Sequence, residues 1–236
     1  MNTNRKTAII VGLLYIIGTV AGILSVVFTG PILGSSDYLI KVSANENQII
    51  IGALFVLTMG FALAMVPVMM FQIFKKHNEA LALGYVVFRG ALETVVYIAM
   101  AISWLLLIIL SQEYVAAGAL DASYFQTLGA LLLKGHDSIN TILIMVFSLG
   151  ALMLYYLFYQ SKLIPRWISG WGFFAILLHL ATGFLIMFRL ASAFSTINIV
   201  MNLPILFQEM VMAVWLIVKG FNPSAIVSGS AKVDID

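Results

Sequence analysis

The chain has 236 residues, of which 62% are hydrophobic and 9% charged, and its mean hydropathy is +1.07. A soluble globular domain carries about 25% charged and about 45–50% apolar residues, so this composition excludes that class and indicates a membrane protein. The formal net charge of +2 argues against binding nucleic acid through a basic patch. Because the chain has no cysteine, disulfides, thiolate metal sites and cysteine nucleophiles are excluded.

Six segments are apolar over the roughly 20 residues that a helix needs to cross a bilayer. Arg5 and Lys6 precede the first of them, but its apolar stretch is too long for a signal peptide, so we expect a retained first helix. The sequence therefore predicts an all-α, polytopic membrane protein with one domain over residues 1–221 and a flexible cytoplasmic tail over 222–236. The six transmembrane helices are expected at about 7–28, 49–74, 81–110, 137–159, 167–188 and 195–219.

The lysines and arginines between these segments predict the orientation, because such residues gather on the cytoplasmic side. With the N-terminus inside, the outer side holds only Lys41, Lys134 and Arg189. The cytoplasmic side then holds the larger set: Arg5, Lys6, Lys75, Lys76, Lys162, Arg166, Lys219 and Lys232. Both termini are therefore expected in the cytoplasm, and the protein in the cytoplasmic (inner) membrane of a cell.

Two smaller features refine this topology. The second long outer loop contains residues 121–133, which are expected to form a short interfacial helix. Pro67 in the second span and Pro204 in the sixth each remove a backbone donor, so each is expected to kink its helix.

Four ionisable residues fall inside the predicted spans: Arg89, Glu93, His179 and Glu209. Each costs roughly 2.5–3.5 kcal/mol at the bilayer centre on insertion scales, so each needs a partner or a purpose. At about 1.5 Å per residue they lie roughly 12–18 Å from the inner ends of their helices. Three helices thus place charged groups at one depth, which predicts a mid-membrane polar site.

Polar neighbours extend this predicted site. Tyr97 continues the helix face of Arg89 and Glu93, and Gln208 directly precedes Glu209. Further supporting residues lie on the fourth and sixth helices: Asp137, Asn198, Asn202 and Pro204. One arginine neutralises only one of two glutamates, so the remaining charge requires a proton, a protonated histidine or a bound cation.

A structural interpretation stands beside the functional one. Polar groups also fasten membrane helices together, and an i,i+4 Arg–Glu pair lowers the insertion cost of its own helix. His179 then becomes a hydrogen-bonded histidine of the bundle, and Asp137 a helix N-cap or a surface group.

Three functions remain open at this stage. The first is a small-solute or ion transporter or ligand-binding protein, which takes a proton, a cation or a small molecule. The second is a non-catalytic structural or regulatory subunit. An intramembrane hydrolase using His136, Asp137 and Ser138 is less favoured, since adjacent helical residues point in different directions. No catalytic or cofactor motif is present, and with His77 in a cytoplasmic loop no three-histidine metal site forms, so no enzyme, cofactor or metal is expected.

Three stretches resemble a known family: Arg89-x-x-x-Glu93, Pro165-Arg166-Trp167-Ile168-Ser169-Gly170-Trp171-Gly172, and Gln208-Glu209-Met210 followed by Trp215 to Phe221. Together they are similar to the bacterial membrane family called domain of unknown function 4386, over nearly the whole chain. The resemblance implies a multi-pass protein of the bacterial inner membrane, and it implies no activity. The basic loop in the second stretch is expected to anchor the fifth helix at the inner leaflet.

Overall fold

The computed structural model describes residues 3–118, 122–191 and 195–226, and within these ranges the chain forms helices and no strand. The first span is α1 (Thr3–Leu33), followed by the short α2 (Tyr38–Ala44) and the second span, α3 (Glu46–Phe74). The third span is composite: α4 (Glu79–Tyr85), the π-helical segment η1 (Val86–Leu92) and α5 (Glu93–Ala117). The last three spans are α6 (Ala122–Ser161), α7 (Arg166–Met187) and α8 (Thr196–Val218).

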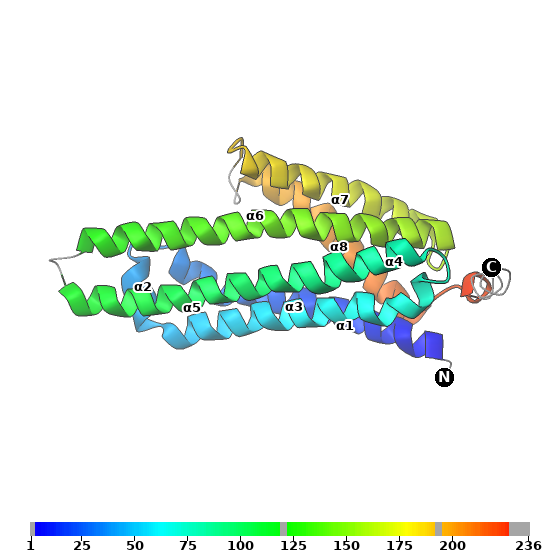
Figure 1. The fold of residues 1–236 in the computed structure, drawn as a ribbon, viewed down its shortest axis with the longest axis horizontal. Coiled ribbons are helices and arrows are strands. Elements are labelled where there is room, and N and C mark those ends of the chain that lie inside the picture. Colours follow the sequence, from blue (N-terminus) through cyan, green and yellow to red (C-terminus); the bar gives the residue numbers. More distant parts are fainter. Residues whose placement is uncertain (1–2, 119–121, 192–194, 227–236) are drawn as a thin grey trace.

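In the described chain, six helical segments are long and apolar enough to cross a membrane, which confirms the predicted all-α, six-span fold. Their extensive contacts follow a cyclic order, in which α1 packs on α3, α3 on α5, α5 on α6, α6 on α7, α7 on α8, and α8 back on α1. The spans thus form a ring around a common interior. Both ends of the chain lie at one end of this bundle, which we call the terminal end (Figure 1).

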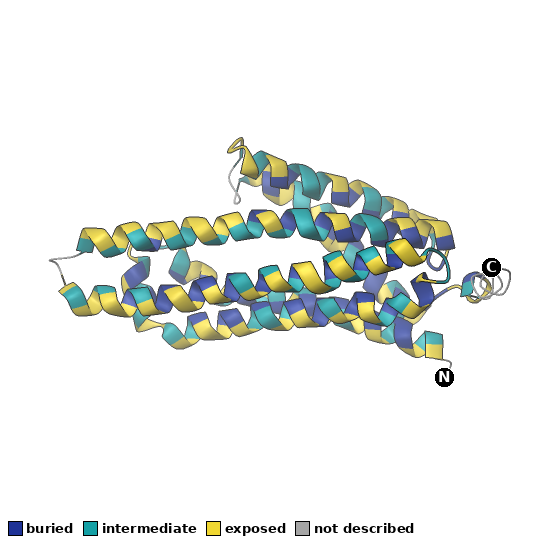
Figure 2. Cartoon of the chain, in the orientation of Figure 1, coloured by how far each residue is buried: buried dark blue, intermediate teal, exposed yellow. Residues whose placement is uncertain are grey.

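Each span turns one stripe of buried residues inward and an apolar face outward (Figure 2). On the outer faces Val27, Leu54, Val95, Phe174 and Val218 are all more than half exposed. Exposed apolar side chains of this density are incompatible with water and suit contact with lipid acyl chains. The chain is therefore a multi-pass membrane protein.

The third and fourth spans are much longer than predicted. They have 39 and 40 residues, about 60 Å each at 1.5 Å per residue, whereas the hydrocarbon core of a bilayer is about 30 Å thick. The separate helix predicted over 121–133 is wrong, because Ala122–Leu133 is continuous with α6, while residue 121 lies outside the described residues. Polar residues lower the hydropathy there without breaking the helix, and Gly129 lets α6 pack closely on Tyr38 of α2.

Smaller differences concern the prolines and the tail. Pro67 and Pro204 both lie inside helices that continue past them. Residues 223–226, at the start of the predicted tail, form a helical turn in which Ala225 is buried, and Phe221 just before it is also buried. The backbone N–H of Asn222 donates to the carbonyl oxygen of Leu163 at 2.9 Å, which ties the segment to the bundle. The remainder of the predicted tail, 227–236, lies outside the described residues.

Candidate functional site: a charged cluster beside a central cavity

The centre of the bundle contains a three-residue ion cluster. Arg89 Nη1 lies 3.0 Å from both carboxylate oxygens of Glu93, and Arg89 Nη2 lies 3.2 Å from Glu209 Oε1. The side chains of Arg89 and Glu93 are 1% exposed, and that of Glu209 is 14% exposed. Three of the four charged residues singled out from the sequence therefore meet, and they join the third span to the sixth.

The backbone around Arg89 is irregular, and no sequence pattern indicated this. In η1 the N–H of Glu93 donates to the carbonyl of Phe88, five residues back instead of four. Such π-helical turns are rare in proteins, and those that occur are often found at functional sites. The segment is closely packed, because an added Cβ at Gly150 of α6 would lie 3.1 Å from Arg89 Cβ. The position of the guanidinium is thus fixed by packing as well as by charge.

His179 does not join this cluster. Its Nδ1 hydrogen-bonds with Asn202 Oδ1, and its ring edge packs on Phe147 at 5.0 Å between centroids. The Arg89 guanidinium also contacts Phe147, with its Cζ 4.2 Å from the ring centroid. Phe147 therefore contacts both the histidine and the cluster. One guanidinium faces two carboxylates, so the cluster carries one excess negative charge unless a proton or a cation is bound.

A cavity of about 750 Å³ lies on the side of the cluster away from the terminal end, and none of the three cluster residues is among the residues that line it. Each of the six spans contributes to its wall, for example through Ser25, Met59, Trp104, His136, His179 and Asn202. The wall extends to Gly34, just beyond the end of α1. Tyr97 lines the cavity and follows Glu93 by one turn on the same helix face, so this residue connects the cavity with the ion cluster.

Aromatic and polar groups meet on one wall of the cavity. The rings of Trp104 and His136 are stacked, with centroids 5.0 Å apart and planes inclined by 15°. His136 Nδ1 lies 2.8 Å from Ser103 Oγ, which donates to the carbonyl oxygen of Met100 at 2.7 Å. The sequence carried a signal for Trp104, which follows Arg89, Glu93 and Tyr97 on one helix face. Ser25 had no such signal.

The remaining predicted site residues divide into two groups. Asp137, Asn198 and Asn202 line the cavity, and Asp137 is not an N-cap because α6 begins at Ala122. Gln208 lies elsewhere, in the packed core: it accepts from the Tyr155 hydroxyl at 2.6 Å and donates to the carbonyl of Ile168 at 3.1 Å. It thereby holds α6, α7 and α8 together, which is a structural contribution.

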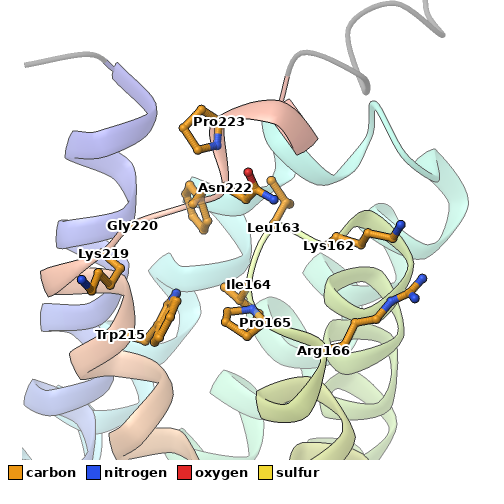
Figure 3. A pocket seen from close by; sticks show the side chains of 11 residues that line it. Lys162, Leu163, Ile164, Pro165, Arg166, Trp215, Lys219, Gly220, Asn222 and Pro223 are labelled. Carbon is orange, nitrogen blue, oxygen red and sulfur yellow. The ribbon is translucent and has the colours of Figure 1, made fainter.

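A second pocket, of about 450 Å³, lies at the terminal end between the loop before α7 and the end of α8 (Figure 3). Lys162 and Arg166 extend to one side of it, and Lys219 to the other. The Arg166 guanidinium lies over the ring of Tyr159, 4.9 Å from its centroid. Since the cations diverge, the pocket does not gather them on one anion, and their arrangement suits anchoring at lipid headgroups.

Among residues 3–118, 122–191 and 195–226, no three histidine, aspartate or glutamate side chains stand close enough to hold a metal ion.

The family model described as "Domain of unknown function (DUF4386)" matches residues 10–220, which include the ion cluster and the cavity. The chain belongs to the DUF4386 family. The resemblance drawn from the three sequence stretches is thereby confirmed. No curated protein and no solved structure matches the chain. The description of DUF4386 assigns no activity, so function has to be argued from the site.

Proposed function

We propose that this DUF4386 chain is a small-solute binding or transport protein of the bacterial cytoplasmic membrane, and that its ligand occupies the central cavity. The observation that carries the proposal is that all six spans line one cavity of about 750 Å³. Ligand sites typically enclose about 300–1,000 Å³, with mostly apolar walls and a few polar groups. A bundle that only had to be stable would fill this space, because unfilled volume lowers the free energy of unfolding.

The ion cluster supplies a coupling element in this proposal. Glu209 is its most exposed member and accepts a single hydrogen bond from Arg89, whereas Glu93 accepts two. Glu209 is therefore the group that takes up and releases a proton or a small cation. Arg89 sets the charge of the site, and Tyr97 relays the state of Glu93 to the cavity.

The basic residues support an orientation for the cavity. Seven described lysines and arginines belong to the terminal end, which we assign to the cytoplasm: Arg5, Lys6, Lys75, Lys76, Lys162, Arg166 and Lys219. The opposite end holds Lys41, Lys134 and Arg189. Because the cavity wall reaches the opposite end at Gly34, we expect the cavity to open toward the outside.

The competing functions are less well supported. A hydrolase would need an activated nucleophile, and Ser103 is near a histidine. Its hydroxyl oxygen, however, lies within hydrogen-bond distance of both the Met100 carbonyl and His136 Nδ1, so its proton is not directed to the histidine alone. A structural or regulatory subunit accounts for the ion cluster and leaves the cavity without a role.

Cysteine labelling tests the proposal, because the native chain contains no cysteine. Asn202→Cys, in the cavity wall, is compared with Met70→Cys, a fully buried position in the packed core. Both are treated in cells with a membrane-impermeant, cationic methanethiosulfonate reagent. We expect Asn202→Cys to react from outside and Met70→Cys to stay unmodified. Labelling of Asn202→Cys from both sides of the membrane would indicate transport. Labelling from one side only would indicate binding. Equal resistance of the two positions would contradict the proposal and favour the structural subunit.

A further inference from the structure

Two buried hydrogen-bond donors in the cavity wall have no partner among the described residues. They are the indole N–H of Trp104, on α5, and the hydroxyl of Ser25, on α1. The two residues are 6% and 2% exposed. Burying a donor without an acceptor is unfavourable, and nearly all such groups in native proteins are paired. A bound ligand would supply the missing acceptor.

Some polar groups near these two side chains are paired. Thr29 Oγ1 donates to the carbonyl of Ser25 at 2.9 Å. Ser103 is bonded to Met100 and to His136. Ser25 Oγ and Trp104 Nε1 have no partner in the described structure, and neither do Arg89 Nε, Ser148 Oγ and Ser169 Oγ, which belong to residues outside the cavity wall.

The two residues that carry these donors pack around the same glycine. A Cβ added at Gly52 of α3 would meet Thr29 Cγ2 and would lie 3.6 Å from Trp104 Cζ3 and 3.7 Å from the carbonyl oxygen of Ser25. The ring of His136 stacks on Trp104 and fixes the plane of the indole. The first, second, third and fourth spans thus combine to hold two donors in fixed positions beside the cavity.

The charges in the wall restrict what the ligand is. The described lining contains no lysine or arginine, and Asp137 is its only carboxylate. An anion would meet a carboxylate and no fixed cation. An ammonium group would bring further donors and leave Trp104 unpaired, since an indole N–H donates only, whereas the Ser25 hydroxyl both donates and accepts. An uncharged acceptor satisfies both donors, and the apolar side chains Val56, Met59 and Met100 provide space for an apolar body.

We propose that the cavity binds an uncharged amphipathic molecule whose acceptor oxygen, such as a ketone or ester carbonyl, hydrogen-bonds to Trp104 Nε1 and Ser25 Oγ. This inference rests on the proposed function, because it names the class of ligand that the cavity takes. The apolar part of the molecule lies among the methionine and valine side chains. The carbonyl oxygen lies at the wall formed by α1 and α5.

Three probes of one shape test this assignment: 2-acetylnaphthalene, which has the acceptor, 2-ethylnaphthalene, which lacks it, and 2-naphthoate, which is charged. Dissociation constants are measured with the purified full chain in one detergent, for wild type, Trp104→Phe, Ser25→Ala and Trp215→Phe. Trp215 lines the distant terminal-end pocket and serves as the control. Each probe partitions into the detergent micelles to the same extent in every sample. Comparing the dissociation constant of one probe between variants therefore removes this contribution.

We expect Trp104→Phe to weaken binding of 2-acetylnaphthalene by about tenfold, the loss of one hydrogen bond, and Ser25→Ala to weaken it by a smaller factor. Binding of 2-ethylnaphthalene should be unchanged in both variants, which also shows that they are folded. Trp215→Phe should leave all values unchanged. The inference would be overturned if the variants weakened binding of 2-acetylnaphthalene and 2-ethylnaphthalene equally, or if neither cavity variant changed binding. It would also be overturned if 2-naphthoate bound most tightly, or if no probe bound.

The two proposals fail in different ways. If Asn202→Cys is labelled from outside but the probes do not distinguish Trp104→Phe from wild type, the cavity stands as a ligand site and the assigned ligand class is wrong. If Asn202→Cys is as resistant to labelling as Met70→Cys, the proposed function itself fails.

Discussion

The two halves of the bundle differ in how they are packed. In the half toward the terminal end, large side chains such as Tyr15, Tyr85 and Tyr155 are fully buried, and the buried charges of Arg89 and Glu93 are paired. In the other half, the same six spans leave a cavity, and two donors of its lining residues are unpaired. Arg89 Nε and Ser169 Oγ are also unpaired in the packed half. An unpaired polar group therefore points to a ligand only where a cavity lies beside it.

The largest effect is expected from Arg89→Gln, which leaves two carboxylates without their cation in the packed half. Removing one member of a buried ion pair costs about 3–5 kcal/mol, because the remaining charge is desolvated and unpaired. The free energy of unfolding in one detergent measures this. Lys162→Gln, at an exposed position, is the control and should match wild type. A change below about 1 kcal/mol for Arg89→Gln, the scale of an exposed ion pair, would show that the cluster does not hold the bundle together.

The next prediction divides the cluster into a structural and an adjustable carboxylate. Glu93→Gln removes an acceptor of two hydrogen bonds that is 1% exposed, and should cost about 1–3 kcal/mol. Glu209→Gln removes the excess charge of a cluster that has two carboxylates and one guanidinium. We expect its free energy of unfolding to stay within about 1 kcal/mol of wild type, or to rise. Unfolding of both variants across pH 5–9 makes the comparison. A larger loss for Glu209→Gln than for Glu93→Gln would reverse the assignment.

A pair of glycines on α6 probes the packing difference between the halves. A Cβ at Gly150 would press on the backbone nitrogen and Cβ of Arg89 at 3.2 and 3.1 Å, whereas a Cβ at Gly135 would meet nothing within 4 Å. Gly150→Ala should therefore destabilise by about 1–2 kcal/mol through overpacking. Gly135→Ala should stabilise by about 0.5–1 kcal/mol, since alanine favours a helix interior over glycine. The midpoints of thermal unfolding of the two variants, measured side by side, test this difference. Equal changes in the two midpoints would mean that η1 moves to accommodate the added methyl group at little cost.

Hydropathy predicted the number and the order of the spans, because every helix that faces lipid must be apolar over its length. It failed on the length of α6, where Ala122–Leu133 is helical although polar residues interrupt the apolar pattern. Helix continuation there depends on packing against α2 and α5, which a single segment does not encode.

The candidate site was predictable only in part. Charges inside predicted spans identified Arg89, Glu93 and Glu209, since each is costly in lipid and needs a partner. Their depth suggested that His179 belonged with them, but depth does not determine which groups meet, and His179 pairs with Asn202 instead. The cavity is a property of the whole ring of helices and has no signature in any one of them.

The smallest expected effect concerns the cavity wall. Ser25→Ala removes a hydroxyl that has no partner in the described structure, so no hydrogen bond is lost, and alanine is the better helix former. We expect the free energy of unfolding to be unchanged or to rise by up to about 1 kcal/mol. Ser103→Ala is the matched substitution on the facing helix, and it should lose about 1–2 kcal/mol because Ser103 is bonded to both Met100 and His136. Thermal unfolding without added ligand measures both. A destabilised Ser25→Ala would mean that its hydroxyl is already bonded within the bundle. A stabilised one would mean that the serine is kept at a cost to the fold, as residues at binding sites commonly are.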